Sequence, residues 1–308
     1  MTEFLRVDFA FLVFPGFLFT AVAGVIASFV DRKVSARVQW RKGPPLLQPV
    51  YDFVKLLGKE ITVPAGAPKI TFLAAPLFGL SAITIVSTII WTTLLNPSNT
   101  EGFVGDLIVV LYLFAIPALS IIVGAFASKN PIASIGASRE MKLLLGYELP
   151  FIISIIVPVI KSDSIKLGGI VQHQLSSGAF AGSISGIIAL IVSIICIQAK
   201  MGLIPFDVAE AEQEIIAGPL IEYSGPSLAV FKLMKWIMLF TVPSFVVLLF
   251  FPGAGFLSNF LRYVILLVVA ILIKNTNPRA RIDQAIKFFW TYCTIAGVLA
   301  VVLALYGL

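Results

Sequence analysis

Residues 200–227 read KMGLIPFDVAEAEQEIIAGPLIEYSGPS and lie between two long apolar runs. This stretch contains five of the sixteen acidic residues of the chain, which are Asp207, Glu210, Glu212, Glu214 and Glu222. Carboxylates placed this close to hydrocarbon are costly, and they usually mark paths for protons or other ions. The stretch therefore indicates ion handling next to a membrane.

The composition of the rest of the chain agrees with a membrane location. Of 308 residues, 59% are hydrophobic and only 12% are charged, and the mean hydropathy is +1.02. A soluble domain of this size needs far more charge to cover its surface. We therefore expect one integral membrane domain over residues 1–308.

Charged residues, prolines and glycines divide the apolar sequence into about eight predicted membrane spans. The spans lie near residues 8–30, 70–95, 105–127, 143–161, 180–199, 228–250, 259–275 and 286–307. This pattern predicts an all-α, polytopic membrane protein. The predicted cytoplasmic loops are residues 31–69, 128–142, 200–227 and 274–287.

The distribution of basic residues predicts the orientation. Of the 22 Lys and Arg residues, only Arg6, Lys161, Lys166 and Arg262 fall on the side of the even-numbered loops. Basic residues concentrate in cytoplasmic loops, so both termini are predicted to lie on the outer side of the cell membrane. The net charge of +6 then reflects those loops, and nucleic-acid binding is not expected.

A surface helix is predicted inside the first cytoplasmic loop. Pro49 is suited to the first turn of a helix, and Val50, Val54 and Leu57 recur at helical spacing after it. Such a helix would lie along the membrane surface or beneath a docked partner. A basic loop that faces lipid headgroups explains the periodicity equally well.

Span 4 contains a candidate ion-carrying residue. Glu148 is followed by Pro150 and then by apolar residues up to Ile160, which places its carboxylate inside the membrane boundary. The alternative is a glutamate that reaches water at the interface. Because intramembrane carboxylates are rare without a role, we favour a functional Glu148.

The acidic stretch has a helical interpretation as well. If residues 207–216 are helical, then Asp207, Glu210 and Glu214 share one face and Glu212 points elsewhere. Neighbouring carboxylates repel, so at least one is expected to have a raised pKa. The alternative is a solvated acidic face, which we prefer for Glu212 alone.

The chain offers few ligands for a cofactor. Its two cysteines, Cys196 and Cys293, lie in separate apolar runs, and no C-x-x-C spacing occurs. An iron–sulfur cluster or a structural zinc bound by this chain alone is therefore not expected.

Two blocks of sequence resemble a known family. The first runs from Arg32-Lys33 through Ala36-Arg37-Val38-Gln39, Gly43-Pro44 and Gln48-Pro49 to Asp52, Lys55-Leu56 and Lys59-Glu60. The second contains Ile204-Pro205-Phe206-Asp207, Glu210-Ala211-Glu212, Glu214, Ala217-Gly218 and Glu222-Tyr223-Ser224-Gly225. Together they resemble the H-type (ND-one-like) membrane subunit of respiratory complex I and of energy-converting membrane-bound [NiFe] hydrogenases.

Two departures place the chain nearer to the hydrogenase or sulfur-reductase branch. Arg139 and Glu140 stand before span 4 where complex I members usually have Arg, Gln and Ser, and Lys235-Trp236 replaces a common Glu-Tyr pair. Both departures argue against quinone as the electron acceptor.

The resemblance implies a role for several residues. The implied proton or ion relay consists of Glu148, Asp207, Glu210, Glu214, Glu222 and Glu140. The implied docking surface for a peripheral redox arm consists of Arg37, Gln39, Arg41, Asp52, Lys55, Lys59 and Arg139.

The resemblance also implies a function for the whole protein. The chain would anchor and couple a redox-driven ion pump, first a ferredoxin-dependent membrane-bound [NiFe] hydrogenase, with a sulfur-reducing complex or a quinone-reducing complex I as alternatives. Iron–sulfur clusters and a Ni–Fe centre would belong to partners, namely hydrogenase-like large and small subunits and an iron–sulfur subunit. Small membrane subunits and antiporter-like subunits would be further partners. A stand-alone secondary transporter is a distant alternative, because no internal repeat is visible, and a purely structural anchor is another.

Overall fold

The computed structural model describes residues 9–96, 105–253 and 255–308, and the described residues contain helices and no strand. Seven helical stretches are long and apolar enough to cross a membrane, and α8 is a shorter apolar helix. The spans are α2 (Phe17–Val38), α4 (Lys69–Leu95), α5 (Asp106–Ala127), α6 (Pro131–Ser162), α8 (Ile184–Lys200), α10 (Gly225–Phe250), α11 (Phe256–Thr276) and a continuous stretch over Ile282–Leu305. The predicted all-α architecture with about eight spans is confirmed.

The last span is interrupted by a wider turn. It consists of α12 (Ile282–Lys287), a π-helical turn, η3 (Phe288–Cys293), and α13 (Thr294–Leu305). The Thr294 hydroxyl donates a hydrogen bond of 2.9 Å to the Phe289 carbonyl, five residues back. This bond stabilises the π-helical geometry, which is rare and often lies near functional sites.

Short helices connect the spans. The predicted surface helix is α3 (Gln48–Leu57), which begins with Gln48 and Pro49. At the other end of the molecule α7 (Leu167–Ser177) and the 3₁₀ turn η1 (Phe180–Gly182) precede α8. The acidic stretch contains only α9 (Glu212–Ile215) and the 3₁₀ turn η2 (Gly218–Leu220).

Helix α10 forms the centre of the bundle, because nearly all of its side chains are buried. The Trp91 ring of α4 stacks on Phe240 at a centroid distance of 5.0 Å, and Tyr263 of α11 contacts Phe240 from another side at 5.0 Å. Helix α2 approaches α10 closely at Gly24, where an added Cβ would lie 2.7 Å from the Trp236 carbonyl carbon. Aromatic stacking and one close helix crossing therefore hold the core together.

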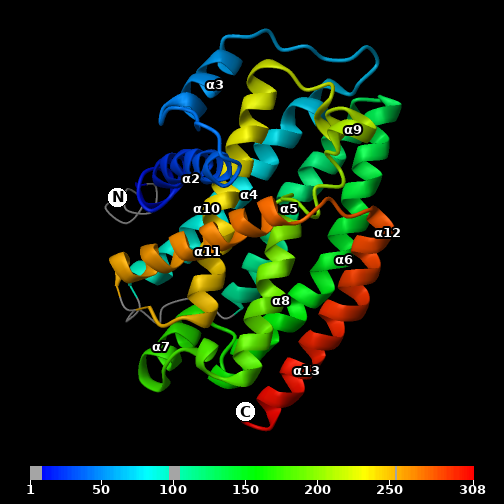
Figure 1. Ribbon diagram of the computed structural model, residues 1–308. Helices are drawn as coiled ribbons and strands as arrows, with labels where there is room; N and C mark the ends of the chain where they lie inside the picture. The colour runs from blue at the N-terminus through cyan, green and yellow to red at the C-terminus, as the bar shows by residue number, and fades with distance from the viewer. Residues whose placement is uncertain (1–8, 97–104, 254) are drawn as a thin grey trace.

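The two ends of the bundle differ in what they carry. Figure 1 shows α3 and α9 at one end, and α7 and the C-terminus at the opposite end. The first end holds the loops that the charge distribution assigns to the cytoplasm, and we call it the basic end. Arg6, one of the four basic residues assigned to the outer side, lies outside the described residues.

The structure differs from the predicted boundaries in three places. Residues 131–142, which were expected in a loop, form the first turns of α6, whose 32 residues make a helix of about 48 Å. That length exceeds the roughly 30 Å hydrocarbon core, so α6 projects beyond it. The connection before α8 contains the helix α7, and span 7 is longer than expected because α11 has 21 residues.

Candidate ion-relay site

The acidic stretch is an irregular loop that folds back into the basic end of the bundle. Residues 201–211 form turns, and the only helix between 207 and 216 is α9. The condition for a shared helical face of Asp207, Glu210 and Glu214 is therefore not met, and the helical interpretation is wrong for most of this segment. Tertiary contacts override the local helical spacing here.

Phe206 anchors this loop in the core. Its side chain is buried and packs on two rings of the π-helical turn, with centroid distances of 4.6 Å to Phe289 and 6.0 Å to Phe288. A backbone hydrogen bond of 2.8 Å from Ala280 N–H to the Pro205 carbonyl ties the loop to the segment between α11 and α12. These contacts fix the carboxylate of the next residue, Asp207.

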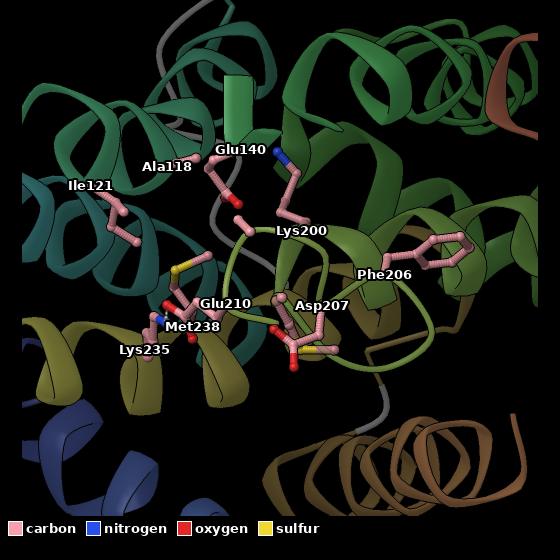
Figure 2. A pocket seen from close by; sticks show the side chains of 12 residues that line it. Ala118, Ile121, Glu140, Lys200, Phe206, Asp207, Glu210, Lys235 and Met238 are labelled. Carbon is pink, nitrogen blue, oxygen red and sulfur yellow. Dashed lines mark hydrogen bonds and ion pairs between the residues drawn. The ribbon is translucent and has the colours of Figure 1, made fainter. Parts of the chain in front are cut away.

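A small cavity with charged walls lies beneath the loop, and we call it the relay cavity. Its volume is about 30 Å³, which is enough for about one or two water molecules. Figure 2 shows side chains from α6, α8, the acidic loop and α10 around it. Its charged lining residues are Glu140, Lys200, Asp207, Glu210 and Lys235.

Two carboxylates of the cavity have basic partners. Glu210 forms an ion pair with Lys235 of α10, and both side chains are about one-third exposed. Asp207 forms an ion pair of 3.1 Å with Arg279 and is more deeply buried. Burial raises the pKa of Asp207 to about 6, and the neighbouring Glu210 carboxylate adds to this effect. The prediction that one carboxylate of the cluster has a raised pKa agrees with this value.

Glu140 lines the same cavity from α6. Within the described residues, its carboxylate forms no hydrogen bond and no ion pair. The charged groups that act on it are Glu210, Lys235 and Asp207, which line the same cavity.

Glu148 lies two helical turns further along α6 and has a partner that the sequence did not reveal. Its Oε2 lies 3.0 Å from Nζ of Lys200, the last residue of α8. The Lys200 side chain is 0% exposed, whereas that of Glu148 is 22% exposed. Lys200 is therefore enclosed in the bundle, whereas Glu148 is partly exposed on α6, and its role in ion transfer stays a prediction.

The remaining predicted relay residues lie nearer to the surface. Glu214 forms an ion pair with Arg139 and is 57% exposed. Both residues line a groove of about 280 Å³ together with Asp207 and Arg279. Glu222 accepts a hydrogen bond from Asn130, the N-cap residue of α6, and so braces that helix. The structure does not describe the Glu212 side chain.

The predicted docking residues cluster at the basic end, around the ends of α2, α3 and α11, and we call this cluster the platform. Arg32 of α2 bonds Asp52 of α3 at 2.8 Å, and this hydrogen bond lowers the pKa of Asp52. Gln39 donates a hydrogen bond of 3.1 Å to Asn275 of α11. The other residues of the platform are exposed, namely Arg37, Arg41, Lys55 and Lys59. Arg139 instead lies in the groove, paired with Glu214.

Four residues of the site were missed by the sequence analysis, namely Lys200, Lys235, Arg279 and Trp40. Lys200 falls among the loop cations there, although it follows the buried residues Ser193 and Cys196 at helical spacing, which is a usable signal. Trp40 is 98% exposed within the platform, and exposed tryptophans are enriched at protein interfaces. Within the described parts of the chain, no group of three or more His, Cys, Asp or Glu residues is placed to hold a metal ion.

Fold and site together define a multi-pass helical membrane protein with a cavity lined by charged residues and a separate basic platform. The family model described as NADH dehydrogenase matches residues 9–305. The chain therefore belongs to this family, in its H-type branch of membrane subunits, which confirms the resemblance drawn from the sequence.

Two relatives illustrate the place of the chain within this family. It is 32% identical over 290 residues to the H subunit of the NADH-quinone oxidoreductase of Geobacillus sp. (strain WCH70), covering 87% of this chain and 83% of that protein. It is also similar to a chain in the structure of the membrane-bound sulfane sulfur reductase, an archaeal respiratory membrane complex. That match has a TM-score of 0.88 and 29% identity, and covers 99% of this chain and 100% of the other. These findings support the hydrogenase and sulfur-reductase branch, and make this chain a membrane subunit of a complex I-like complex.

Proposed function

We propose that this subunit couples electron transfer in a docked peripheral arm to ion translocation in neighbouring membrane subunits. The observation that carries the proposal is a continuous set of charged residues. It begins with Asp207 and Arg279 in the surface groove, continues through the relay cavity, and ends at the Lys200–Glu148 pair inside the spans. Charged residues at that depth are usually functional.

The proposed mechanism is electrostatic. A charge change in the docked arm alters the ion pairs of Arg139 and Arg279, which lie in the exposed groove. Asp207 responds first, because its pKa of about 6 is close to neutral pH. Glu210 and Glu140 follow through the shared cavity, since charges separated by a small cavity are weakly screened.

Glu148 is proposed as the exit of this relay. Its side chain is 22% exposed, and its neighbours Leu145 and Leu149 on α6 are exposed apolar residues. Lys200 pairs with one side of this carboxylate, and the exposed part is costly against lipid unless a neighbouring subunit covers it. We propose that a small membrane subunit or an antiporter-like subunit covers this face of α6.

We propose that the complex is a ferredoxin-dependent membrane-bound [NiFe] hydrogenase, in which protons accept the electrons. The Arg139-Glu140 sequence supports this acceptor. Sulfane sulfur is the second candidate, supported by the similarity to the sulfane sulfur reductase chain. In both cases the peripheral arm would consist of hydrogenase-like large and small subunits and an iron–sulfur subunit. The arm would dock on the cytoplasmic side, with both termini of this chain outside.

The coupling proposal is tested with Glu148→Gln and Asp207→Asn in the assembled complex. Ion translocation per electron is expected to fall in both variants while electron transfer continues. Asp163→Asn is the matched control, because Asp163 is exposed after the far end of α6, and asparagine tolerates its left-handed backbone conformation. Unchanged coupling in both relay variants would remove these residues from the mechanism and leave a structural anchor.

The acceptor is tested by purifying the chain with its partners in mild detergent. Nickel in the purified complex and four cysteines in the co-purifying large subunit would support the hydrogenase. Sulfane sulfur reduction without nickel would favour the second candidate. A chain that purifies alone and transports ions would contradict both and support the secondary transporter.

A further inference from the structure

A polar stripe runs along α2 where this helix reaches the basic end of the bundle. Asp31, Ser35 and Gln39 recur every four residues, so they lie on the same side of the helix. All three contact the end of α11, through Lys274 and Asn275. The stripe therefore connects the platform, to which Gln39 belongs, with the last turn of α11.

These contacts are close, and the ion pair among them is mostly shielded from water. Lys274 Nζ lies 2.8 Å and 3.0 Å from the two oxygens of the Asp31 carboxylate. The Asp31 side chain is 16% exposed and that of Lys274 is 25% exposed. Asn275 donates a hydrogen bond of 3.0 Å to Ser35 and accepts one of 3.1 Å from Gln39. A displacement of the end of α2 therefore moves the end of α11 with it.

The chain that follows α11 holds the acidic loop. Only five residues separate the end of α11 from the start of α12. Within them, the Ala280 N–H donates a hydrogen bond of 2.8 Å to the Pro205 carbonyl. Arg279 forms its ion pair of 3.1 Å with Asp207. We call residues 274–281 the link segment, because they contact α2 at one end and the acidic loop at the other.

The link segment also acts on Asp207 through its charges. Burial is the main cause that raises the pKa of Asp207, and the Glu210 carboxylate adds to it. Three cations lower this pKa, namely Arg279, Lys235 and Lys274. Lys274 therefore takes part both in the contacts with α2 and in the charge balance at the relay carboxylate.

We propose that the link segment transmits changes at the platform to the relay, with Asp31, Lys274 and Asn275 as its positioning residues. A docked arm that displaces the end of α2 moves Asp31 relative to Lys274. The ammonium is then countered to a different extent, and its effect on the Asp207 carboxylate changes. The same displacement shifts Arg279, because three residues lie between it and Asn275. This inference rests on the proposed coupling function.

Charge variants at the two ends of the Asp31–Lys274 pair are expected to shift the titration of Asp207 in opposite directions. Lys274→Gln removes a positive charge and should raise the midpoint. Asp31→Asn removes the negative charge that counters Lys274, and should lower it. A charge in direct contact shifts a carboxylate pKa by about one to three units. Lys274 is in direct contact with Asp31 instead, so each shift at Asp207 should be about half a pH unit.

Infrared pH-difference spectra of the purified complex measure this midpoint, with the Asp207 band identified by its loss in Asp207→Asn. A merely structural role of the pair predicts no opposition of sign. Lys274→Arg keeps the charge and should titrate like the wild type. The other charged groups that line the cavity or the groove beside Asp207 are the same in all variants, namely Glu140, Lys200, Arg139, Glu214, Arg281 and Asp283.

Asn275→Ala tests the contacts with α2 without changing any charge. The variant loses the hydrogen bonds to Ser35 and Gln39. Ion translocation per electron is expected to fall by roughly twofold to thirtyfold, the range for substitutions along a coupling network, while electron transfer continues. Thr276→Ala is the matched control, because the Thr276 hydroxyl bonds the Leu272 carbonyl of its own helix rather than α2.

The outcomes distinguish this inference from the function on which it rests. Unchanged midpoints, or shifts of the same sign in Lys274→Gln and Asp31→Asn, would overturn the link, and so would normal coupling in Asn275→Ala. If Lys274→Gln does not assemble, Asp31→Asn and Asn275→Ala decide. Normal coupling in Glu148→Gln and Asp207→Asn would overturn the coupling function itself, whereas the Asp207 midpoints are read without any ion translocation.

Discussion

The Lys200–Glu148 pair and the Arg139–Glu214 pair join the same kinds of charge in very different surroundings. The first has a basic side chain with 0% exposure, whereas the second has an acidic side chain that is 57% exposed. In the groove, water and salt screen the attraction, and ions of a partner can compete for either residue. Between α6 and α8, the buried Lys200 ammonium depends on the Glu148 carboxylate.

The difference shows how a relay can respond easily to a docked partner at one end and resist small changes at the other. Exposed pairs respond to a docked partner because they can be broken at little cost. A buried pair changes only when its whole environment changes, since an unpaired charge there is unfavourable. Asp207 connects the two regions, because it lines both the groove and the relay cavity.

The largest effect is expected from Glu148→Ala. The substitution leaves the Lys200 ammonium buried and unpaired, and it should destabilise the subunit by about 3–5 kcal/mol. Thermal unfolding of the purified complex, followed by loss of the co-purifying subunits, measures this change. If Glu148→Ala melts like the wild type, the pair does not exist as described.

The next largest effect is expected from Phe206→Ala, which removes the anchor of the acidic loop. A buried phenylalanine truncated to alanine costs about 3 kcal/mol or more. Because Phe206 anchors the acidic loop, the loop should detach in this variant. Protease sensitivity between residues 201 and 211 should then increase together with the loss of stability. Phe206→Leu is the control, and it should restore most of the protection.

Asp207 should produce a pH dependence of intermediate size. Its folded pKa of about 6 exceeds the ordinary value of 3.8, so the folded state binds the extra proton between about pH 4 and pH 6. Stability should therefore decrease as the pH rises through this range, by roughly 2 kcal/mol. Melting curves at pH 4 and pH 6 should show this difference for the wild type and a smaller one for Asp207→Asn. An equal difference in both proteins would show that Asp207 is solvated.

The smallest effect is expected from Glu214→Ala. An exposed ion pair contributes about 0–1 kcal/mol, so the melting temperature should hardly change. A loss of several kcal/mol would mean that the groove is covered in the complex and that the two regions are alike. Measuring this variant in the free subunit and in the complex shows where any change arises.

The sequence predicted the spans well, because bilayer thickness imposes a strong constraint on apolar length. It also predicted α3, where Pro49 and the spacing of Val50 and Val54 agree with one helix. Short connections were harder to predict. Gly168 and Gly169 weaken the helical pattern of α7, and the helical spacing of Asp207 and Glu210 is overruled by the packing of Phe206.

The partners of the charged residues could not be predicted from local patterns. A lysine at the end of an apolar run usually extends towards water, and only a glutamate 52 positions earlier draws Lys200 inside. Likewise, Glu222 follows the other acidic residues in the sequence, yet it braces Asn130 at the start of α6. Such pairings depend on which helices become neighbours, and a single sequence does not contain that information.

The π-helical turn at Phe288–Cys293 sets the rotation of the last span. Each residue of an α-helix turns the following side chains by about 100°, so removing one residue here, for example Thr291, would rotate everything after it by that angle. In the present register Phe289 packs on Phe206. Gly297 of α13 lies against Ile153 of α6, where an added Cβ would be 3.0 Å from a methyl group. Without the extra residue of the π-helical turn, Gly297 would be rotated by about 100° away from Ile153. The wider turn therefore sets which side chains of the last span face their partners. Phe289 contacts the acidic loop, and Gly297, further along the same span, contacts α6.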